Sequence, residues 1–170
     1  MKILFLTIFL FVFSVDHRPA EGIYDLTLTS ATYNRDNGHF ECRMKEGVTG
    51  NELHSKSVDL TVLLKPSQPS IRPKNPTATE GRLLNLTCSS VGGSPPPKIQ
   101  WFRENDNRIM DSTYIEGKNK DEPTKAVLSI NPTEEDDGNS YKCTVWNRAM
   151  KQGKQKDRST KIYVNCKLSI

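Results

Sequence analysis

Four residues in the second half of the chain stand at spacings that strongly restrict its fold. Cys143 follows Cys88 by 55 positions, Trp101 follows Cys88 by 13, and Tyr141 precedes Cys143 by two. Around them, apolar and polar residues alternate in short runs that Gly, Pro, Asn and Asp separate. Alternation with a period of two predicts half-buried antiparallel strands, whereas helical periodicity is absent.

This spacing is that of an immunoglobulin-like β-sandwich, so the predicted fold class is all-β. In that fold the two cysteines bridge the two sheets, the tryptophan packs against the bridge, and the tyrosine hydroxyl fixes a corner. We therefore predict a disulfide between Cys88 and Cys143, buried beside Trp101. Tyr141 and Asp137 complete the expected fold signature. Asp137 lies in the acidic turn before Tyr141 and should cap that turn or pair with a base, which the sequence does not identify.

The boundaries of this domain follow from composition. The segment 65–76 is rich in proline and polar residues, which is typical of a linker that leads into an edge strand. The sequence therefore predicts one complete immunoglobulin-like domain over residues 66–166 and a short tail over residues 167–170.

The first part of the chain repeats the end of the same pattern. The stretch RDNGHFEC, residues 35–42, has the order of acid, turn, aromatic, spacer and cysteine that DDGNSYKC has at 136–143. Alternating apolar residues lie on both sides of it. We predict that residues 21–65 are strands E to G of a truncated domain. Its missing sheet would have covered four apolar residues: Leu26, Phe40, Met44 and Leu60.

No cysteine precedes Cys42, so the strand that would carry its partner is absent from the sequence. We expect a truncated form of a longer protein, which arises from alternative splicing or from an incomplete gene model. Cys42 and Cys166 are then unpaired cysteines. The alternative is a bridge between these two, although they lie in different predicted domains and disulfide geometry is strict.

The N-terminus carries a targeting signal. Lys2 precedes the unbroken apolar run from Ile3 to Phe13, which is the length of a secretory signal core and too short to span a bilayer. We predict a signal peptide over residues 1–20, with cleavage after Ala20 preferred over Ser14; the alternative is a membrane anchor. No later stretch is long enough for a transmembrane helix, so the expected location is extracellular, where disulfides persist.

The sequence offers no set of catalytic residues, so we predict that the protein is not an enzyme. No serine lies in a nucleophile elbow, and no cysteine or histidine stands at metal-ligand spacing, so no metal or cofactor is expected. The formal net charge of +4 is too small to indicate a nucleic-acid partner.

The same alternation predicts an outward-facing aromatic stripe. If Trp101, Tyr141 and Cys143 face the core, then Phe102 and Trp146 face outward, and so does Tyr163 on the last strand. Exposed aromatics on one sheet are typical of protein-contact surfaces, which makes Phe102, Trp146 and Tyr163 the candidate partner-binding residues. The alternative is cross-strand packing that only stiffens the sheet.

Two further surface features are predicted. Asn85 begins the glycosylation acceptor Asn-Leu-Thr and should point outward because Leu86 points inward. Six bases make the hairpin before the last strand positive, which suggests a site for acidic glycans such as heparan sulfate: Arg148, Lys151, Lys154, Lys156, Arg158 and Lys161. The alternative for this basic patch is a solvated loop.

Three stretches carry a resemblance to a known family: TYNRDNGHFECRMK, LNLTCSSVGGSPPPKIQWFRE and EEDDGNSYKCTVWNRAM. They resemble the first two domains of the echinoid-like, nephrin-like members of the immunoglobulin superfamily. The resemblance implies a cell-adhesion molecule whose partners are homophilic or heterophilic receptors of the same superfamily, and whose full-length form is held at the plasma membrane at cell junctions. This chain departs from such proteins because it lacks half of the first domain, all later domains and the membrane span.

Overall fold

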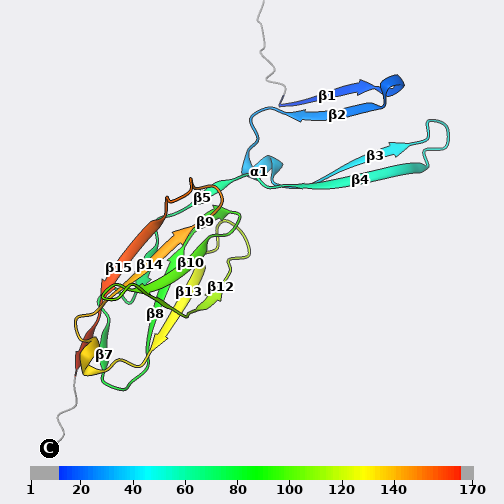
Figure 1. Ribbon diagram of the computed structural model, residues 1–170. Coiled ribbons are helices and arrows are strands. Elements are labelled where there is room, and N and C mark those ends of the chain that lie inside the picture. The colour runs from blue at the N-terminus through cyan, green and yellow to red at the C-terminus, as the bar shows by residue number, and fades with distance from the viewer. Residues whose placement is uncertain (1–11, 166–170) are drawn as a thin grey trace, which may run out of the picture. The chain divides into compact units, whose positions relative to one another are not determined.

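The computed structural model describes residues 12–165, and strands make up most of it. The chain divides into two compact units, residues 1–62 and 63–170, and each unit is described by itself. Figure 1 shows the strands of both units. Within residues 12–165, no helix has the length and apolar character needed to cross a bilayer.

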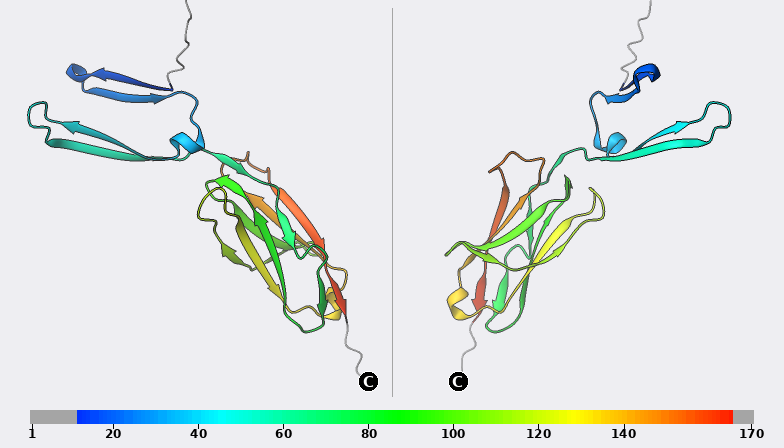
Figure 2. Two further views of the ribbon diagram at one scale, coloured as in Figure 1. Left: turned by 180° about the vertical axis from the view of Figure 1, so that it is seen from behind. Right: turned by 45° about the vertical axis from the view of Figure 1, so that its right-hand side comes forward.

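The second unit is a sandwich of two four-stranded sheets, in the orders β11-β10-β14-β15 and β12-β13-β8-β6, which face each other as two layers (Figures 1 and 2). Its strands are β5 (Leu64–Pro66), β6 (Ser70–Arg72), β7 (Thr77–Thr79), β8 (Leu84–Ser90), β9 (Gly92–Ser94), β10 (Lys98–Arg103), β11 (Arg108–Met110), β12 (Thr113–Ile115), β13 (Thr124–Ile130), β14 (Ser140–Trp146), β15 (Lys156–Lys161) and β16 (Tyr163–Asn165). Two short pairs complete it, with β5 antiparallel to β9 and β16 parallel to β7.

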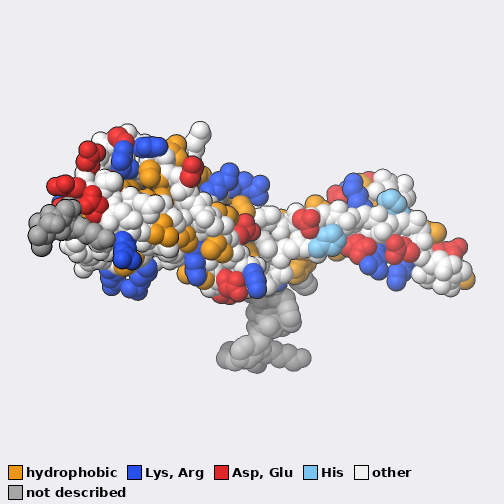
Figure 3. All heavy atoms as spheres, turned by 90° about the horizontal axis from the view of Figure 1, so that it is seen from below, with side chains coloured by type: hydrophobic (Ala, Val, Ile, Leu, Met, Phe, Trp, Pro, Cys, Tyr) orange, Lys and Arg blue, Asp and Glu red, His pale blue; other side chains and the backbone are white. Residues whose placement is uncertain are grey.

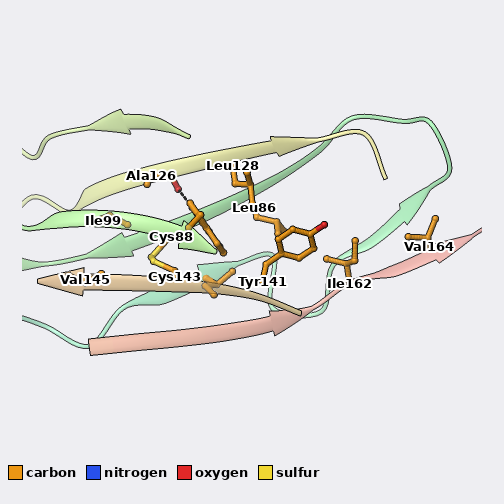
Figure 4. Packing of buried hydrophobic residues seen from close by; sticks show 12 residues of the cluster. Leu86, Cys88, Ile99, Ala126, Leu128, Tyr141, Cys143, Val145, Ile162 and Val164 are labelled. Atoms are coloured by element: carbon orange, nitrogen blue, oxygen red, sulfur yellow. Dashed lines mark hydrogen bonds between the residues drawn. A yellow bond between two sulfur atoms is a disulfide. The ribbon is translucent and has the colours of Figure 1, made fainter. Parts of the chain in front are cut away.

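A disulfide joins the two sheets, as the spacing predicted. It links Cys88 on β8 to Cys143 on β14, with a Cα–Cα distance of 6.3 Å. Trp101 is fully buried on β10, and its indole Nε1–H donates a hydrogen bond of 3.1 Å to the carbonyl oxygen of Ala126 (Figure 4). The prediction of an immunoglobulin-like β-sandwich is therefore confirmed.

Alternation along the strands produces this core. On β8, Leu86 and Cys88 are buried while Asn85 is exposed, because successive side chains of a strand point to opposite faces. The same alternation buries one face of most of the other strands of the two sheets. Together they form one apolar cluster: Ile71, Leu86, Cys88, Ile99, Trp101, Ala126, Leu128, Tyr141, Cys143, Val145, Ile162 and Val164.

The acidic turn before β14 corrects one prediction. The 3-10 turn Glu134–Asp136 makes Asp136, and not Asp137, the residue that caps it: the Asp136 carboxylate accepts from the backbone N–H of Thr133 at 3.0 Å and from the Tyr141 hydroxyl at 3.4 Å. The expected basic partner is Arg103, whose guanidinium lies 3.8 Å from Asp136. Asp137 instead accepts the backbone N–H of Val164 at 2.8 Å, which fixes the turn to β16.

Electrostatics around this turn follow from burial and from its hydrogen bonds. Burial opposes ionisation of Asp136, but donation from Thr133 and from the Asn139 amide, together with the positive charge of Arg103, lowers its pKa below the usual value. Burial and the neighbouring Asp136 charge raise the pKa of Tyr141 to about 12, so the tyrosine stays a hydrogen-bond donor at all physiological pH values.

The first unit consists of two hairpins. Its elements are β1 (Phe13–Arg18), the 3-10 turn Pro19–Glu21, β2 (Ile23–Leu28), α1 (Tyr33–Asp36), β3 (Gly38–Lys45) and β4 (Glu52–Leu60). Strand β1 pairs with β2, and β3 pairs with β4, both antiparallel. Three strands stand where the sequence predicted them, whereas β1 lies inside the predicted signal peptide, whose residues 1–11 are outside the described part of the chain.

The apolar faces of these hairpins are open, as expected for a unit without its second sheet. Leu26 is 47% exposed and Met44 43% exposed, while Phe40 and Leu60 are half-buried. Residues from β2, β3 and β4, among them Leu26, Phe40 and Leu60, line a cavity of about 360 Å³. The assignment of this unit to a truncated immunoglobulin-like domain stays a prediction.

Candidate protein-binding face

The outward side of the sheet β11-β10-β14-β15 carries two of the three predicted aromatic residues. Trp146 lies opposite Lys98, and Phe102 lies opposite Lys142, so all four side chains share one face of β10 and β14. Both aromatic residues are half-buried. Trp146 follows Lys142 by four positions along β14, which places Phe102 and Trp146 about 13 Å apart along the strand direction.

The surface around Trp146 is hollowed on two sides. One hollow, of about 460 Å³, lies between Trp146 and the loop that follows it. The other, of about 600 Å³, lies between Trp146 and Tyr114 of β12. Pro95 and Pro96 line both hollows. The indole therefore forms the wall between two depressions, and an apolar side chain of a partner can enter either of them.

Buried polar contacts hold this region in place. Asn147 is only 7% exposed, and its side-chain amide donates to the carbonyl oxygens of Leu64 at 2.7 Å and Pro95 at 2.9 Å. The Tyr114 hydroxyl donates to the carbonyl oxygen of Pro97 at 2.9 Å. These bonds fix the segment before β10 and the end of β14 relative to each other. The hollows beside Trp146 are therefore built into the fold.

Phe102 has a different environment. The ammonium group of Lys142 lies 5.7 Å from the centre of its ring, which is a cation–π contact that covers part of the aromatic face. Neither hollow beside Trp146 includes Phe102. Phe102 is therefore a second, separate aromatic position on the sheet.

Tyr163 corrects the prediction of one continuous stripe. It lies on β16, which pairs with β7 and belongs to a different sheet from Phe102 and Trp146. The backbone N–H of Tyr163 donates to the carbonyl oxygen of Pro76 at 3.0 Å, so the chain has left β14 for β7 at this point. Its ring is exposed and lies 6.0 Å from the ammonium group of Lys161.

The predicted basic patch does not gather on one face of its hairpin. Lys156 and Arg158 lie opposite the inward-facing Val145 and Cys143, whereas Lys161 lies opposite Ser140, on the other side of β15. Lys156 is also engaged, since its ammonium group donates to the carbonyl oxygen of Pro66 at 2.7 Å. The remaining exposed bases, Arg148, Lys151 and Lys154, line the hollow beside Trp146 together with Lys98. Binding of acidic glycans stays a prediction.

The other predicted sites are placed as follows. Asn85 is exposed on β8, and its side-chain oxygen accepts from the Ser129 hydroxyl at 2.7 Å. Cys42 is a free, exposed cysteine on β3. Cys166 lies outside the described residues. Between residues 12 and 165, no group of His, Cys, Asp and Glu could hold a metal ion.

Sequence reasoning missed the supports of this face. Asn147, Tyr114 and the prolines at 95 and 96 act through contacts with segments 17 to 83 positions away, which alternation cannot reveal. The run of three prolines directly before β10 was the available signal, because such a run fixes the backbone at the entrance of a strand.

Comparison with known proteins finds an immunoglobulin domain in the second unit. Residues 68–147 match the model of an immunoglobulin domain. The chain is 32% identical over 137 residues to human Kin of IRRE-like protein 1 (79% of this chain, 17% of that protein), and 32% identical over 132 residues to mouse cell adhesion molecule 2 (76% and 28%). The chain thus spans less than a third of the length of these relatives.

A solved structure shows the same fold. The crystal structure of Rst D1-D2 superposes with a TM-score of 0.66 at 24% identity, and the likeness covers 91% of this chain and 75% of that one. Together with the disulfide, the buried tryptophan and the two-layered sheet, these matches identify the chain as one that contains an immunoglobulin domain and whose relatives are cell-adhesion molecules of the immunoglobulin superfamily.

Proposed function

We propose that this chain is an extracellular, non-catalytic recognition protein, which binds other cell-surface proteins through the face around Trp146. Its relatives include a protein named as a cell adhesion molecule, which supports a role in adhesion. Within that superfamily, the echinoid-like affiliation, the junctional location and the origin of the chain as a shortened receptor stay predictions.

The observation that carries this proposal is the position of Trp146 between two hollows on a rigid sheet. Tryptophan is favoured at protein interfaces because it offers a large apolar surface at a small cost in conformational entropy. The buried amide of Asn147 holds the end of its strand, so little order has to be gained on binding. Trp146 gives the hollow an apolar wall, and lysines line its edge. This combination fits a partner surface on which acidic residues surround an apolar side chain.

Bead aggregation tests the proposal. Beads that carry the chain are mixed with beads that carry either the same chain or the ectodomain of human Kin of IRRE-like protein 1. Both predicted unpaired cysteines are replaced by serine, so that thiol chemistry cannot join the beads. Trp146→Ser should reduce aggregation at least about tenfold, as expected for an interface anchor, whereas the matched variant Phe102→Ser should leave it nearly unchanged.

Three controls give the result its meaning. The melting temperature of Trp146→Ser should stay close to that of the parent chain, because the side chain is only half-buried. Added heparin should not inhibit aggregation; strong inhibition would support the glycan-binding alternative. Equal losses in Trp146→Ser and Phe102→Ser, or no aggregation with either kind of bead, would contradict the proposed face.

A further inference from the structure

The second edge of β3 in the first unit is an unpaired strand edge. Within the described residues, β3 pairs only with β4, and this sheet has two strands. A two-stranded hairpin is marginal by itself, and an unpaired edge is a template for another strand. The face of β3 that carries Phe40, Cys42 and Met44 is apolar, and the last two of these residues are exposed.

We propose that the occupant of this edge is a second copy of the same chain, which pairs β3 antiparallel with β3 and places the two Cys42 residues opposite each other on a two-fold axis. In this register Glu41 of each copy faces Arg43 of the other, on the polar side of the sheet. Phe40 of each copy faces Met44 of the other, on the apolar side. Every central pair is therefore complementary.

Charge selects this register over its neighbours. A shift by one residue sets polar against apolar side chains on each face, because side chains alternate along a strand. A shift by two residues in one direction places the two Glu41 carboxylates opposite each other, and in the other direction the two Arg43 guanidinium groups. Like charges directly opposite each other destabilise a sheet. Among the registers within two residues of it, only the one centred on Cys42 avoids both conflicts.

The charges that this register needs are already in position. Arg43 donates to the Glu41 carboxylate at 2.6 Å within one strand, and this bond lowers the pKa of Glu41. Both residues are therefore ionised at neutral pH on the same face of β3. Charged groups of both signs, with histidines between them, are interspersed over the first unit on the side that Figure 3 shows. Pairing two copies would bring Glu41 and Arg43 of both copies together as a cluster of four charges.

Geometry allows a disulfide at the axis. Residues directly opposite in antiparallel strands have Cα atoms about 4.5 or 5.5 Å apart, depending on the type of pair. Disulfides span Cα separations of about 4.4–6.8 Å, so either type accommodates the bond. With oxidised glutathione as the oxidant, the two thiols give up two protons and two electrons, one S–S bond forms between the chains, and two molecules of reduced glutathione are released.

The product is a sheet in the order β4-β3-β3-β4, with one continuous apolar face. Three or more strands with an apolar face can be stable where a lone hairpin is not. This association uses a different unit and a different strand from the face around Trp146. Its test is therefore independent of the proposed function: Trp146→Ser should leave the dimer unchanged.

A charge-swap experiment tests the proposal on the full secreted chain that carries Cys166→Ser. The chain is equilibrated in a buffer of reduced and oxidised glutathione, and the ratio of disulfide dimer to monomer is read from a non-reducing gel. Glu41→Arg and Arg43→Glu should each lower this ratio about tenfold, because each change creates two symmetry-related like-charge pairs. The double variant should recover most of the loss, since it restores both opposite-charge pairs.

Asp59→Arg is the matched control, since it makes the same charge change on β4, away from the proposed edge, and should leave the ratio unchanged. Mass spectrometry should find a Cys42–Cys42 cross-linked peptide. Single variants that dimerise like the parent, a double variant that fails to recover, or a Cys42 that is linked only to glutathione or to another protein would overturn the proposal.

Discussion

The Asp136 carboxylate, which caps the acidic turn before β14, stabilises the folded domain. Its carboxylate accepts hydrogen bonds from the Thr133 backbone, the Thr133 hydroxyl, the Asn139 amide and the Tyr141 hydroxyl, at 3.0–3.4 Å. Hydrogen bonds to a charged group contribute about 1.5–3 kcal/mol, and asparagine can retain only part of this set. Asp136→Asn should therefore lower the free energy of unfolding at pH 7 by about 2 kcal/mol.

The pH dependence fixes the sign of this effect. The folded protein holds the pKa of Asp136 below its unfolded value of about 3.9. The stabilisation is then complete above the unfolded value and is lost as the pH falls through the lower, folded pKa. The difference between parent and Asp136→Asn should consequently be full at pH 7 and shrink as the pH falls below about 4.

Urea unfolding, followed by tryptophan fluorescence, measures this difference at pH 7 and pH 3. Glu134→Gln is the control, because it removes one negative charge from an exposed side chain of the same turn. It should change the free energy of unfolding by less than about 0.5 kcal/mol. A larger loss of stability in Asp137→Asn than in Asp136→Asn, or a loss that does not depend on pH, would contradict this prediction.

Three further predictions concern the fold and processing of the chain. Trp101→Phe should lower the free energy of unfolding by about 2–4 kcal/mol in urea titrations, because it removes the bond to Ala126 and leaves a cavity in the core. Gly117→Ala should lower the melting temperature by several degrees in calorimetry, since its Cβ would collide with the carbonyl group of Glu122. N-terminal sequencing of the secreted chain should start at Glu21, which would remove β1; a start at Val15 would keep most of it.

The core of the fold could be predicted because its determinants are local in the sequence. Alternation along the strands predicts that Cys88, Trp101 and Tyr141 point inward and that their neighbours in sequence point outward. The spacing between these three residues and Cys143 is typical of immunoglobulin-like sandwiches. Tyr163 faces outward, as alternation predicted, but it was assigned to the wrong sheet, because alternation does not show which strand is the neighbour. The strand that pairs with this part of the chain is β14 before Ile162 and β7 after it, and the alternation of side chains does not reveal this change of neighbour.

The turn and the binding face show the same limit. The spacing from Cys143 pointed to Asp137 as the residue that caps the turn. In the structure a single 3-10 turn brings the Asp136 side chain to the backbone N–H of Thr133 instead. The spacing of residues in the sequence does not reveal that this turn is helical. The outward position of Trp146 was predicted from the alternation of side chains along β14. The hollows that make it a candidate anchor depend on Pro95 and Tyr114, whose positions follow from pairing between distant segments.

Hydrogen–deuterium exchange of the chain, alone and mixed with human Kin of IRRE-like protein 1, measures whether a partner covers the face around Trp146. We predict that binding protects residues 98–100 and 146–154, which surround Trp146, and leaves β6, β8 and β13 unchanged. Protection confined to β6, β8, β12 and β13, with the amides around Trp146 exchanging as in the free chain, would contradict it.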